Sequence, residues 1–258
     1  MYFKELSNDV DSDTITLKDI RYQESYYVDD AGGKIILKNT SGQHMLSFLL
    51  QENAVLNFKL ILSKEKSEFR INAELAKNAK LTIEVIDFYD IDSDVAIHSC
   101  LDGEFSSSDV RFAVVANNKK KKKYNVTFTH SYPNTYSSMT GNGVSLGKGS
   151  ITMKGVSTIE EDCIKSEAHQ NVRIVLFDKE SKGHGSPILK TYCDDIVASH
   201  ACAIGSLKEE DFFYLLSRGI DEAEARKLLT LSYLQPTIEL FKEADQEVIK
   251  ESIKGTIL

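Results

Sequence analysis

Apolar and polar residues alternate along a series of short segments between residues 30 and 205. The segments are rich in Val, Ile, Thr and Phe, and stretches of Asn, Asp, Ser, Gly and Lys separate them. Period-two alternation is typical of strands that bury one face, so the sequence predicts an all-β region. Sandwiches, barrels and solenoids all use such strands, and no strict repeat period chooses among them. The predicted strands are KIILKN, NFKLILS, FRINAEL, KLTIEVIDF, DVAIHSCLD, DVRFAVVA, YNVTFTH, SITMKGV, VRIVLF and PILKTY.

Several polar groups between these strands are predicted to form turns. The run from Lys119 to Lys123 is typical of a solvated hairpin tip. The side chains of Asp87, Asp90, Asp92 and Asp94 are expected to bond nearby backbone amides. The glycines of GNGVSLGKGS fit neither phosphate-binding motif and are expected to supply positive φ angles in turns.

The spacing of apolar residues becomes helical from residue 206. Ser206 and Glu209 have capping-box spacing, and Gly219 is expected to end the first helix. Asp221 is expected to open a second helix, and a third is predicted after Pro236. The chain should therefore consist of a β core over residues 1–205 and a helical subdomain over residues 206–258.

Composition limits the classes of protein that fit. The chain has 258 residues, of which 41% are hydrophobic and 27% charged, as is usual for globular proteins. A net charge of −8 argues against nucleic-acid binding. The N-terminus has no leader features and no apolar run reaches about 18 residues, so we expect a cytoplasmic protein that does not bind membranes. Cysteines in that compartment should be thiols.

A candidate metal site precedes the first helix. His200 and Cys202 are one residue apart in a predicted strand, so their side chains should point to the same face. Together with Cys193, Asp194 and Asp195 they offer imidazole, thiol and carboxylate groups, which suit iron and iron–sulfur species. The structural alternative is that Cys202 is a small buried hydrophobe and His200 a hydrogen-bonded wall residue.

The segment DDIVASHACAIGSLKEEDFFYLLSRGIDEAEARKLL closely resembles the C-terminal signature of the SufB/SufD family. Members of this family are scaffold subunits of the SUF iron–sulfur cluster assembly machinery. The shared features are an acidic pair, a Ser-His, a Gly five residues after that His, and a Phe-Tyr-Leu-x-Ser-Arg-Gly-Ile run. A weaker likeness extends upstream through Gln170, Gly155 and His130 in THSYPNTYSS.

This resemblance implies a right-handed parallel β-helix core with a C-terminal α-helical subdomain. It also implies that His200, at the family's Ser-His position, helps to build a transient iron–sulfur cluster between scaffold subunits. The chain departs from the family at Ala198, where SufD-type sequences commonly have Cys, and near Gln170, where SufB-type chains have an essential Cys. These departures argue against a self-sufficient SufB-like scaffold, and we hypothesise that Cys202 and Cys193 compensate as metal ligands.

The resemblance further implies two kinds of protein partner. The C-terminal helices of the family dock a SufC-type ATPase. The chain is also expected to pair through strands within residues 160–205, either with a second copy or with a SufB-like paralogue. The residues expected to contact the ATPase are Phe212, Phe213, Tyr214, Arg218 and Gly219.

We therefore expect a SufD-like scaffold that has no turnover of its own and no permanently bound cofactor. One alternative is a cytosolic β-helix enzyme that acts on carbohydrate, which should show a groove lined by carboxylates. The other is an interaction module that has kept the fold and lost cluster assembly. The cluster type and the sulfur donor lie beyond what the sequence implies.

Overall fold

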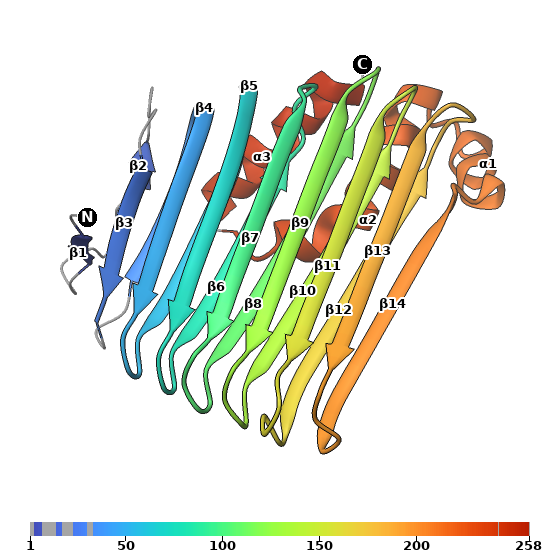
Figure 1. Ribbon diagram of the computed structural model, residues 1–258. Coiled ribbons are helices and arrows are strands. Elements are labelled where there is room, and N and C mark those ends of the chain that lie inside the picture. Colours follow the sequence, from blue (N-terminus) through green and yellow to red (C-terminus); the bar gives the residue numbers. More distant parts are fainter. Residues whose placement is uncertain (1–2, 7–13, 17–22, 30–32, 242, 258) are drawn as a thin grey trace.

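Parallel strands dominate the architecture of the chain (Figure 1). A computed structural model describes residues 3–6, 14–16, 23–29, 33–241 and 243–257. All strand pairs among these residues are parallel, and the strands wind into a β-helix of about six turns. The expected all-β core and parallel β-helix are therefore confirmed.

The β-helix has two facing sheets that share one long strand. That strand, β5 (Val55–Leu75), pairs through its first part with β6 and through its second part with β7. One sheet then contains β7 (Ser93–Leu101), β9 (Lys121–His130), β11 (Ser150–Ile159) and β13 (Lys182–Thr191). The other contains β6 (Lys80–Asp87), β8 (Ser107–Ala116), β10 (Tyr136–Ser145), β12 (Ser166–Leu176) and β14 (Ile196–Ser206).

The N-terminal strands continue this arrangement. β4 (Gly33–Leu50) pairs with β5 along both of its parts, while β3 (Gln23–Val28) and β2 (Thr14–Thr16) pair with different parts of β4. β1 (Phe3–Leu6) pairs with β3. Side chains from the inner faces of both sheets fill the space between them, because period-two alternation sends every second residue inward. Phe58, Phe69, Phe112, Tyr124 and Phe128 are among the largest fully buried ones.

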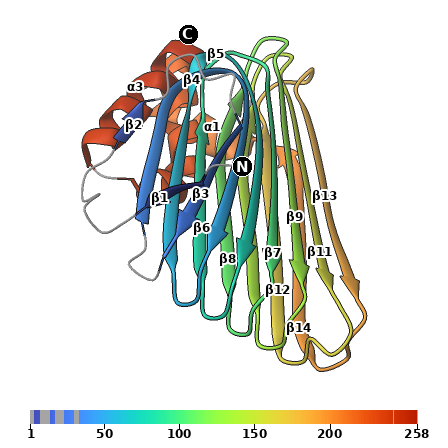
Figure 2. The same cartoon turned by 60° about the vertical axis from the view of Figure 1, so that its left-hand side comes forward.

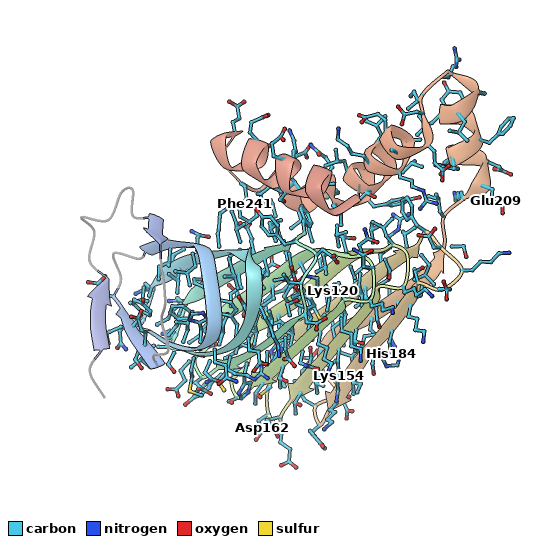
Figure 3. The ribbon with its side chains drawn as sticks, turned by 90° about the horizontal axis from the view of Figure 1, so that it is seen from above. Lys120, Lys154, Asp162, His184, Glu209 and Phe241 are labelled. Carbon is cyan, nitrogen blue, oxygen red and sulfur yellow. The ribbon has the colours of Figure 1, made fainter. Side chains whose placement is uncertain are left out.

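Three helices follow the last strand and lie along one side of the β-helix (Figures 2 and 3). They are α1 (Glu209–Ser217), α2 (Glu222–Ile238) and α3 (Glu243–Ile257). Apolar side chains of α2 and α3 pack on outward-facing residues of β6, β8 and β10 in a second core, which buries Leu234, Ile238, Ile249 and Ile253. Burial of this apolar area fixes the helices to the sheet.

The turns between the sheets form two stacks. The lower turns, at the bottom of Figure 1, include residues 131–135, 160–165 and 192–195. The upper turns, on the opposite side, include residues 117–120, 146–149 and 177–181. Asn residues with positive φ recur in both stacks, because Asn tolerates the left-handed region better than most residues.

The helix boundaries differ from the sequence prediction in two places. The predicted capping box is wrong, because Lys208 is the N-cap of α1 and no side chain caps that helix. The predicted third helix after Pro236 is confirmed as α3, but it begins later than expected: α2 continues through Pro236 to Ile238, and α3 begins at Glu243. The predicted start of the second helix is confirmed, since Asp221 Oδ1 accepts a hydrogen bond from Glu224 N at 2.9 Å.

Two polar residues predicted to lie in turns are buried in the core. Lys122 lies in β9 and Asp87 ends β6, and both side chains are fully buried. Lys122 Nζ contacts Asp87 Oδ1 at 2.5 Å and donates to the carbonyl oxygen of Tyr89 at 2.8 Å. Tyr124 donates its hydroxyl hydrogen to Asp87 Oδ2 at 2.5 Å, and Ser93 donates to the same oxygen. These hydrogen bonds to both carboxylate oxygens and from the ammonium allow this charge pair to be buried.

The sequence predicts that the glycines of GNGVSLGKGS lie in turns, but two of them lie in β10. Gly141 and Gly143 are buried inside the β-helix. A Cβ at Gly141 would lie 2.6 Å from Met153 Sδ, and one at Gly143 would lie 3.0 Å from Ile151 Cδ1. These glycines therefore make room for large side chains of β11. Gly147, in an upper turn, has the expected positive φ of 56°.

Candidate functional site

The β-helix ends in an open coil formed by β13 and β14. These two strands lie at the ends of the sheet order, so each has one edge without a strand partner among the described residues. Most residues of β14 are exposed, including Val197 at 56% and Ile204 at 40%. Exposed strand edges with apolar side chains are typical of surfaces that pair with another chain. The open coil lies at the right-hand side of Figure 1.

His200 and Cys202 share the inward face of β14, as the period-two pattern predicts. Their partners in β12 are Gln170 and Val172, both of which are buried. The side chains of His200 and Cys202 therefore lie on the last layer of the β-helix interior, and both residues are exposed. This placement brings one imidazole and one thiol to the mouth of the interior, on a strand with an unpaired edge.

Gly185 of β13 leaves the space that the Cys202 thiol occupies. A Cβ added at Gly185 would lie 2.3 Å from Cys202 Sγ and 3.2 Å from Val172 Cγ1. Any larger residue at this position would displace the thiol. Burial raises the pKa of Cys202, so its thiol stays protonated to higher pH than a free cysteine. Because a metal binds the thiolate, coordination here would have to displace that proton.

The buried side chain of Gln170 lies next to His200 in the strand register, and we call it the Gln170 floor. Its side chain is 2% exposed and crosses the interior to β13. Gln170 Nε2 donates to Ser157 Oγ at 2.7 Å and to the Ile188 carbonyl oxygen at 3.0 Å, while Oε1 accepts from Ile188 N at 3.2 Å. Gly155 is required opposite, since a Cβ there would lie 2.6 Å from Gln170 Oε1. The residues Gly155 and Gln170, noted in the upstream likeness, are therefore brought together.

The third predicted metal ligand lies in a different part of the coil. Cys193 and the acidic pair Asp194–Asp195 belong to a lower turn, and roughly 13 Å of extended strand separates Ile196 from His200. Cys193 packs against a small core around Ile159 and Cys163. Within the described residues, no group of three or more His, Cys, Asp and Glu side chains is arranged to hold a metal ion. The structure therefore groups His200 with Cys202 but not with Cys193.

His130 occupies a structural position away from the open coil. Its ring is fully buried, with Nδ1 2.7 Å from Thr135 Oγ1 and Nε2 2.8 Å from Ser137 Oγ. Burial lowers the pKa of His130 to about 4, so the ring is neutral at pH 7. Ser166 Oγ continues this network at 2.8 Å from Thr135 Oγ1. These contacts connect the turn between β9 and β10 to β12.

The predicted ATPase-contacting residues lie on and just after α1. Phe213 is 72% exposed and Tyr214 is 56% exposed, while Phe212 is half-buried and lies 5.8 Å from the guanidinium of Arg226. The guanidinium of Arg218 lies 5.2 Å from the Tyr214 ring, and Gly219 takes the positive φ that ends the helix. Two large exposed aromatic rings on one short helix are typical of a binding surface.

A groove of about 590 Å³ runs beneath α1. It lies between this helix and the end of β12. Arg226 of α2 holds one side of the groove through a 3.1 Å ion pair with Asp178, which lies in an upper turn. The exposed aromatic surface of α1 is thus continuous with a concave region of mixed apolar and charged character. The apolar lining consists of Leu176, Phe177, Leu207, Phe212, Phe213 and Leu216.

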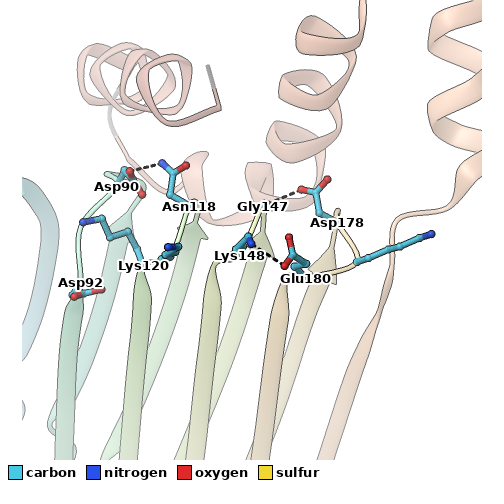
Figure 4. Close-up of a pocket in the computed structure, with 10 residues that line it drawn as sticks. Asp90, Asp92, Asn118, Lys120, Gly147, Lys148, Asp178 and Glu180 are labelled. Atoms are coloured by element: carbon cyan, nitrogen blue, oxygen red, sulfur yellow. Dashed lines mark hydrogen bonds and ion pairs between the residues drawn. The ribbon is translucent and has the colours of Figure 1, made fainter.

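A second groove, of about 800 Å³, lies over the upper turns (Figure 4). Its carboxylates are already engaged by neighbouring turns. Asp90 accepts from Asn118 Nδ2, and Asp92 accepts from Lys121 N. Asp178 accepts from Gly147 N, and Glu180 pairs with Lys148 at 2.9 Å. These contacts connect successive coils. Asp92 bonds a backbone amide as predicted, but that amide belongs to Lys121, the first residue of β9 in the next coil, and not to its own turn.

The open strand edges and the Gln170 floor are the parts of this region that the residue pattern did not reveal. The exposed apolar residues Val197 and Ile204 gave a signal, because Val197 lies on the outer face of β14 and Ile204 on the inner face beside Cys202, and both remain exposed. The described helices include none that is long and apolar enough to span a membrane.

Comparisons with known proteins point to one family. Residues 21–233 match the family model described as SUF system FeS cluster assembly, SufBD core domain. The chain is 26% identical over 155 residues to the iron–sulfur cluster assembly protein SufD of Bacillus subtilis, which covers 60% of this chain and 35% of that protein. It is 28% identical over 132 residues to iron–sulfur cluster assembly SufBD family proteins of Staphylococcus saprophyticus and Staphylococcus haemolyticus, covering 50% of this chain and 28% of each relative. The match spans about a third of the length of these relatives.

Proposed function

The chain belongs to the SufB/SufD family of the SUF system, and on this premise we propose that it is a SufD-like scaffold subunit for iron–sulfur cluster assembly. It acts without turnover of its own and holds a cluster only transiently. It works in the cytoplasm with a SufC-type ATPase and with a second scaffold subunit, which is either another copy or a SufB-like paralogue.

The observation that carries this proposal is the open terminal coil. An exposed strand with an unpaired edge presents His200 and Cys202 on one face, above a buried floor made by Gln170. An imidazole and a thiolate are suitable ligands for iron and iron–sulfur species. Two protein groups leave coordination positions unfilled, so a second subunit facing the open coil would supply the remaining ligands. A scaffold that assembles a cluster for transfer needs this kind of incomplete site.

The unpaired edges support pairing between subunits at the same place. β13 and β14 expose backbone N–H and C=O groups along their outer edges, and the end of the interior exposes apolar atoms. A second coil placed across a two-fold axis would satisfy both requirements, because each edge would add to the edge of its partner. The proposed interface lies within residues 160–205.

The surface of α1 supports docking of the ATPase. Its exposed rings, Phe213 and Tyr214, adjoin the groove beneath the helix, where Arg226 and Asp178 provide charge. Exposed aromatic side chains next to a groove are common anchors in protein interfaces that involve a helix. This surface lies on the helical side of the molecule and leaves the open coil free for the second scaffold subunit.

Titration calorimetry with a purified SufC-type ATPase tests the docking part of the proposal. Phe213→Glu should weaken binding by at least tenfold, because it removes an anchor that is 72% exposed in the free chain. Tyr132→Glu is the matched control: Tyr132 is a 48% exposed aromatic residue in a lower turn, and its replacement should leave affinity unchanged. Equal affinities for the two variants would contradict the docking surface.

The carbohydrate-enzyme alternative receives no specific support. The groove over the upper turns is lined by carboxylates, as that alternative requires, but each of them has a donor from a neighbouring residue. Glycoside hydrolysis needs a free carboxyl pair facing the substrate. The interaction-module alternative differs from our proposal only in cluster assembly, and a cluster measurement on the assembled complex separates the two.

A further inference from the structure

Two cysteines lie in consecutive lower turns, at the same distance from the strand that follows each turn. Cys163 lies three residues before Ser166, the first residue of β12, and Cys193 lies three residues before Ile196, the first residue of β14. Ser166 and Ile196 are direct partners in the strand register. Asp162, labelled in Figure 3, marks the first of these turns. The two cysteines therefore lie in neighbouring turns, of which the first has six residues (160–165) and the second four (192–195).

Backbone hydrogen bonds fix the two turns against each other on both sides of the cysteines. Tyr192 N donates to the Ile159 carbonyl oxygen at 2.9 Å, and Lys165 N donates to the Asp195 carbonyl oxygen at 2.6 Å. Neighbouring backbones in such a stack lie about 4.8 Å apart. A disulfide needs Cα atoms about 4.4–6.8 Å apart, a distance that the spacing of neighbouring coils allows.

The side chains meet in one small core. Cys163 is 1% exposed and packs with Ile159 and Ala168, while the partly exposed Cys193 packs against the same cluster. Cys163 Sγ donates to the His130 carbonyl oxygen at 3.2 Å. Burial raises the pKa of the Cys163 thiol, and the nearby Cys193 sulfur raises it further, which agrees with close approach of the two groups. The Cys163 thiol therefore stays protonated to higher pH than a free cysteine.

We propose that Cys163 and Cys193 form a reversible disulfide that fastens the terminal coil to the coil before it. The partly exposed Cys193 thiol reacts first with a peroxide, which oxidises it to a sulfenic acid and releases water. The Cys163 sulfur then attacks the Cys193 sulfur, a second water leaves, and an S–S bond replaces the two S–H bonds. Two electrons pass from the thiols to the peroxide, and a dithiol reductant restores the thiols by exchange.

The bond would act on the part of the chain that carries the open site. It would enclose β12 and β13 in a covalent loop and tie the turn that starts β14 to the turn that starts β12. End coils of repeat structures open most easily, because they contact a neighbour on one side only. Oxidation should therefore reduce opening of the coil that carries His200.

Peptide mass spectrometry tests the pairing in the full chain. The reduced protein is treated with hydrogen peroxide, its remaining thiols are alkylated, and the digested peptides are measured with and without a dithiol reductant. We expect one reductant-sensitive pair of peptides linking Cys163 to Cys193, with Cys202 absent from it. Cys193→Ser should abolish the linked pair, whereas Cys100→Ser, which changes a half-buried cysteine in β7, should leave it intact.

Hydrogen exchange provides a second measurement that does not depend on a variant. Oxidation should slow amide exchange in β14 several-fold and leave exchange in β8 unchanged, and reduction should reverse the effect. Alkylation of both Cys163 and Cys193 after peroxide treatment, or a linkage from either of them to a different cysteine, would overturn the proposed pair. A correct linkage with unchanged exchange in β14 would overturn its role as a fastening of the terminal coil.

Discussion

Replacing Lys122 with methionine removes one half of a fully buried ion pair. The Lys122 ammonium lies 2.5 Å from Asp87 Oδ1, and both side chains have no exposed surface. Methionine keeps most of the aliphatic volume but leaves the Asp87 carboxylate with hydroxyl donors only, from Tyr124 and Ser93. Breaking a buried pair in this way costs about 3–5 kcal/mol, which is a large part of the stability of a typical domain.

The double variant Asp87→Leu with Lys122→Met separates the loss of the pair from the loss of packing. With both charges removed, the remaining cost comes from the hydroxyls of Tyr124 and Ser93, which lose their acceptor and cost about 1–2 kcal/mol. The double variant should therefore be more stable than the Lys122→Met single variant. Additive effects in the cycle would refute the view that the two charges stabilise each other.

Urea unfolding followed by circular dichroism supplies the free energies. Lys123→Met is the matched control, because Lys123 is the next residue in the lysine run and is exposed on the outer face of β9. Its replacement should change the free energy of unfolding by about 0.5 kcal/mol or less. A Lys122→Met variant as stable as Lys123→Met would show that the pair is not buried as described.

Three further predictions follow from the buried polar groups and the open coil. Burial lowers the pKa of His130 from 6.5 to about 4, so the unfolded chain binds a proton that the folded chain does not as the pH falls through this window. The contribution of neutral His130 to the free energy of unfolding is therefore fully present above pH 6.5, and it falls by about 3 kcal/mol towards pH 4. His130→Gln should remove this part of the pH dependence in urea unfolding. A pH dependence identical to that of the wild type would contradict the buried, neutral state of His130. Gly155→Ala should lower the free energy of unfolding by about 1–3 kcal/mol, because its Cβ would lie 2.6 Å from Gln170 Oε1. Gly205→Ala is the control: its Cβ would have nothing within 4 Å, so it should change the free energy of unfolding by about 0.5 kcal/mol or less. Equal effects of the two variants would argue against the Gln170 floor. Light scattering should show a homodimer of the isolated chain that Ile204→Lys converts to a monomer, and a wild-type monomer at high concentration would contradict pairing through the open coil.

The alternating pattern predicted most of the strands, and it also predicted that His200 and Cys202 share a face. Both predictions need only the local sequence, because successive side chains of a strand point to opposite faces whatever lies next to the strand in space. The chemistry expected at residue 200 came from the likeness of the surrounding segment to the SufB/SufD signature. The parallel β-helix likewise came from that likeness, because the strand pattern alone fits several folds.

The sequence-based predictions were wrong where the position of a residue depends on its partners in other strands of the β-helix. Lys122 looks solvated within its lysine run, but the register of β9 turns it inward to meet Asp87 of β6. Gly141 and Gly143 look like turn residues, but they lie in β10 because Met153 and Ile151 need their space. The packing of Cys163 and Cys193 against one small core is hidden for the same reason, since it depends on the length of one full coil.

The central claim is that His200 builds the cluster site at the open coil, and iron–sulfur reconstitution of the assembled complex tests it most directly. His200→Ala should eliminate the cluster, measured by absorbance and iron content, while changing the free energy of unfolding by about 0.5 kcal/mol or less, because the residue is exposed. Ser199→Ala, on the opposite face of β14, should assemble the cluster normally, and Cys202→Ser shows whether the neighbouring thiol is also a ligand. Normal cluster content in the His200→Ala complex would contradict the account.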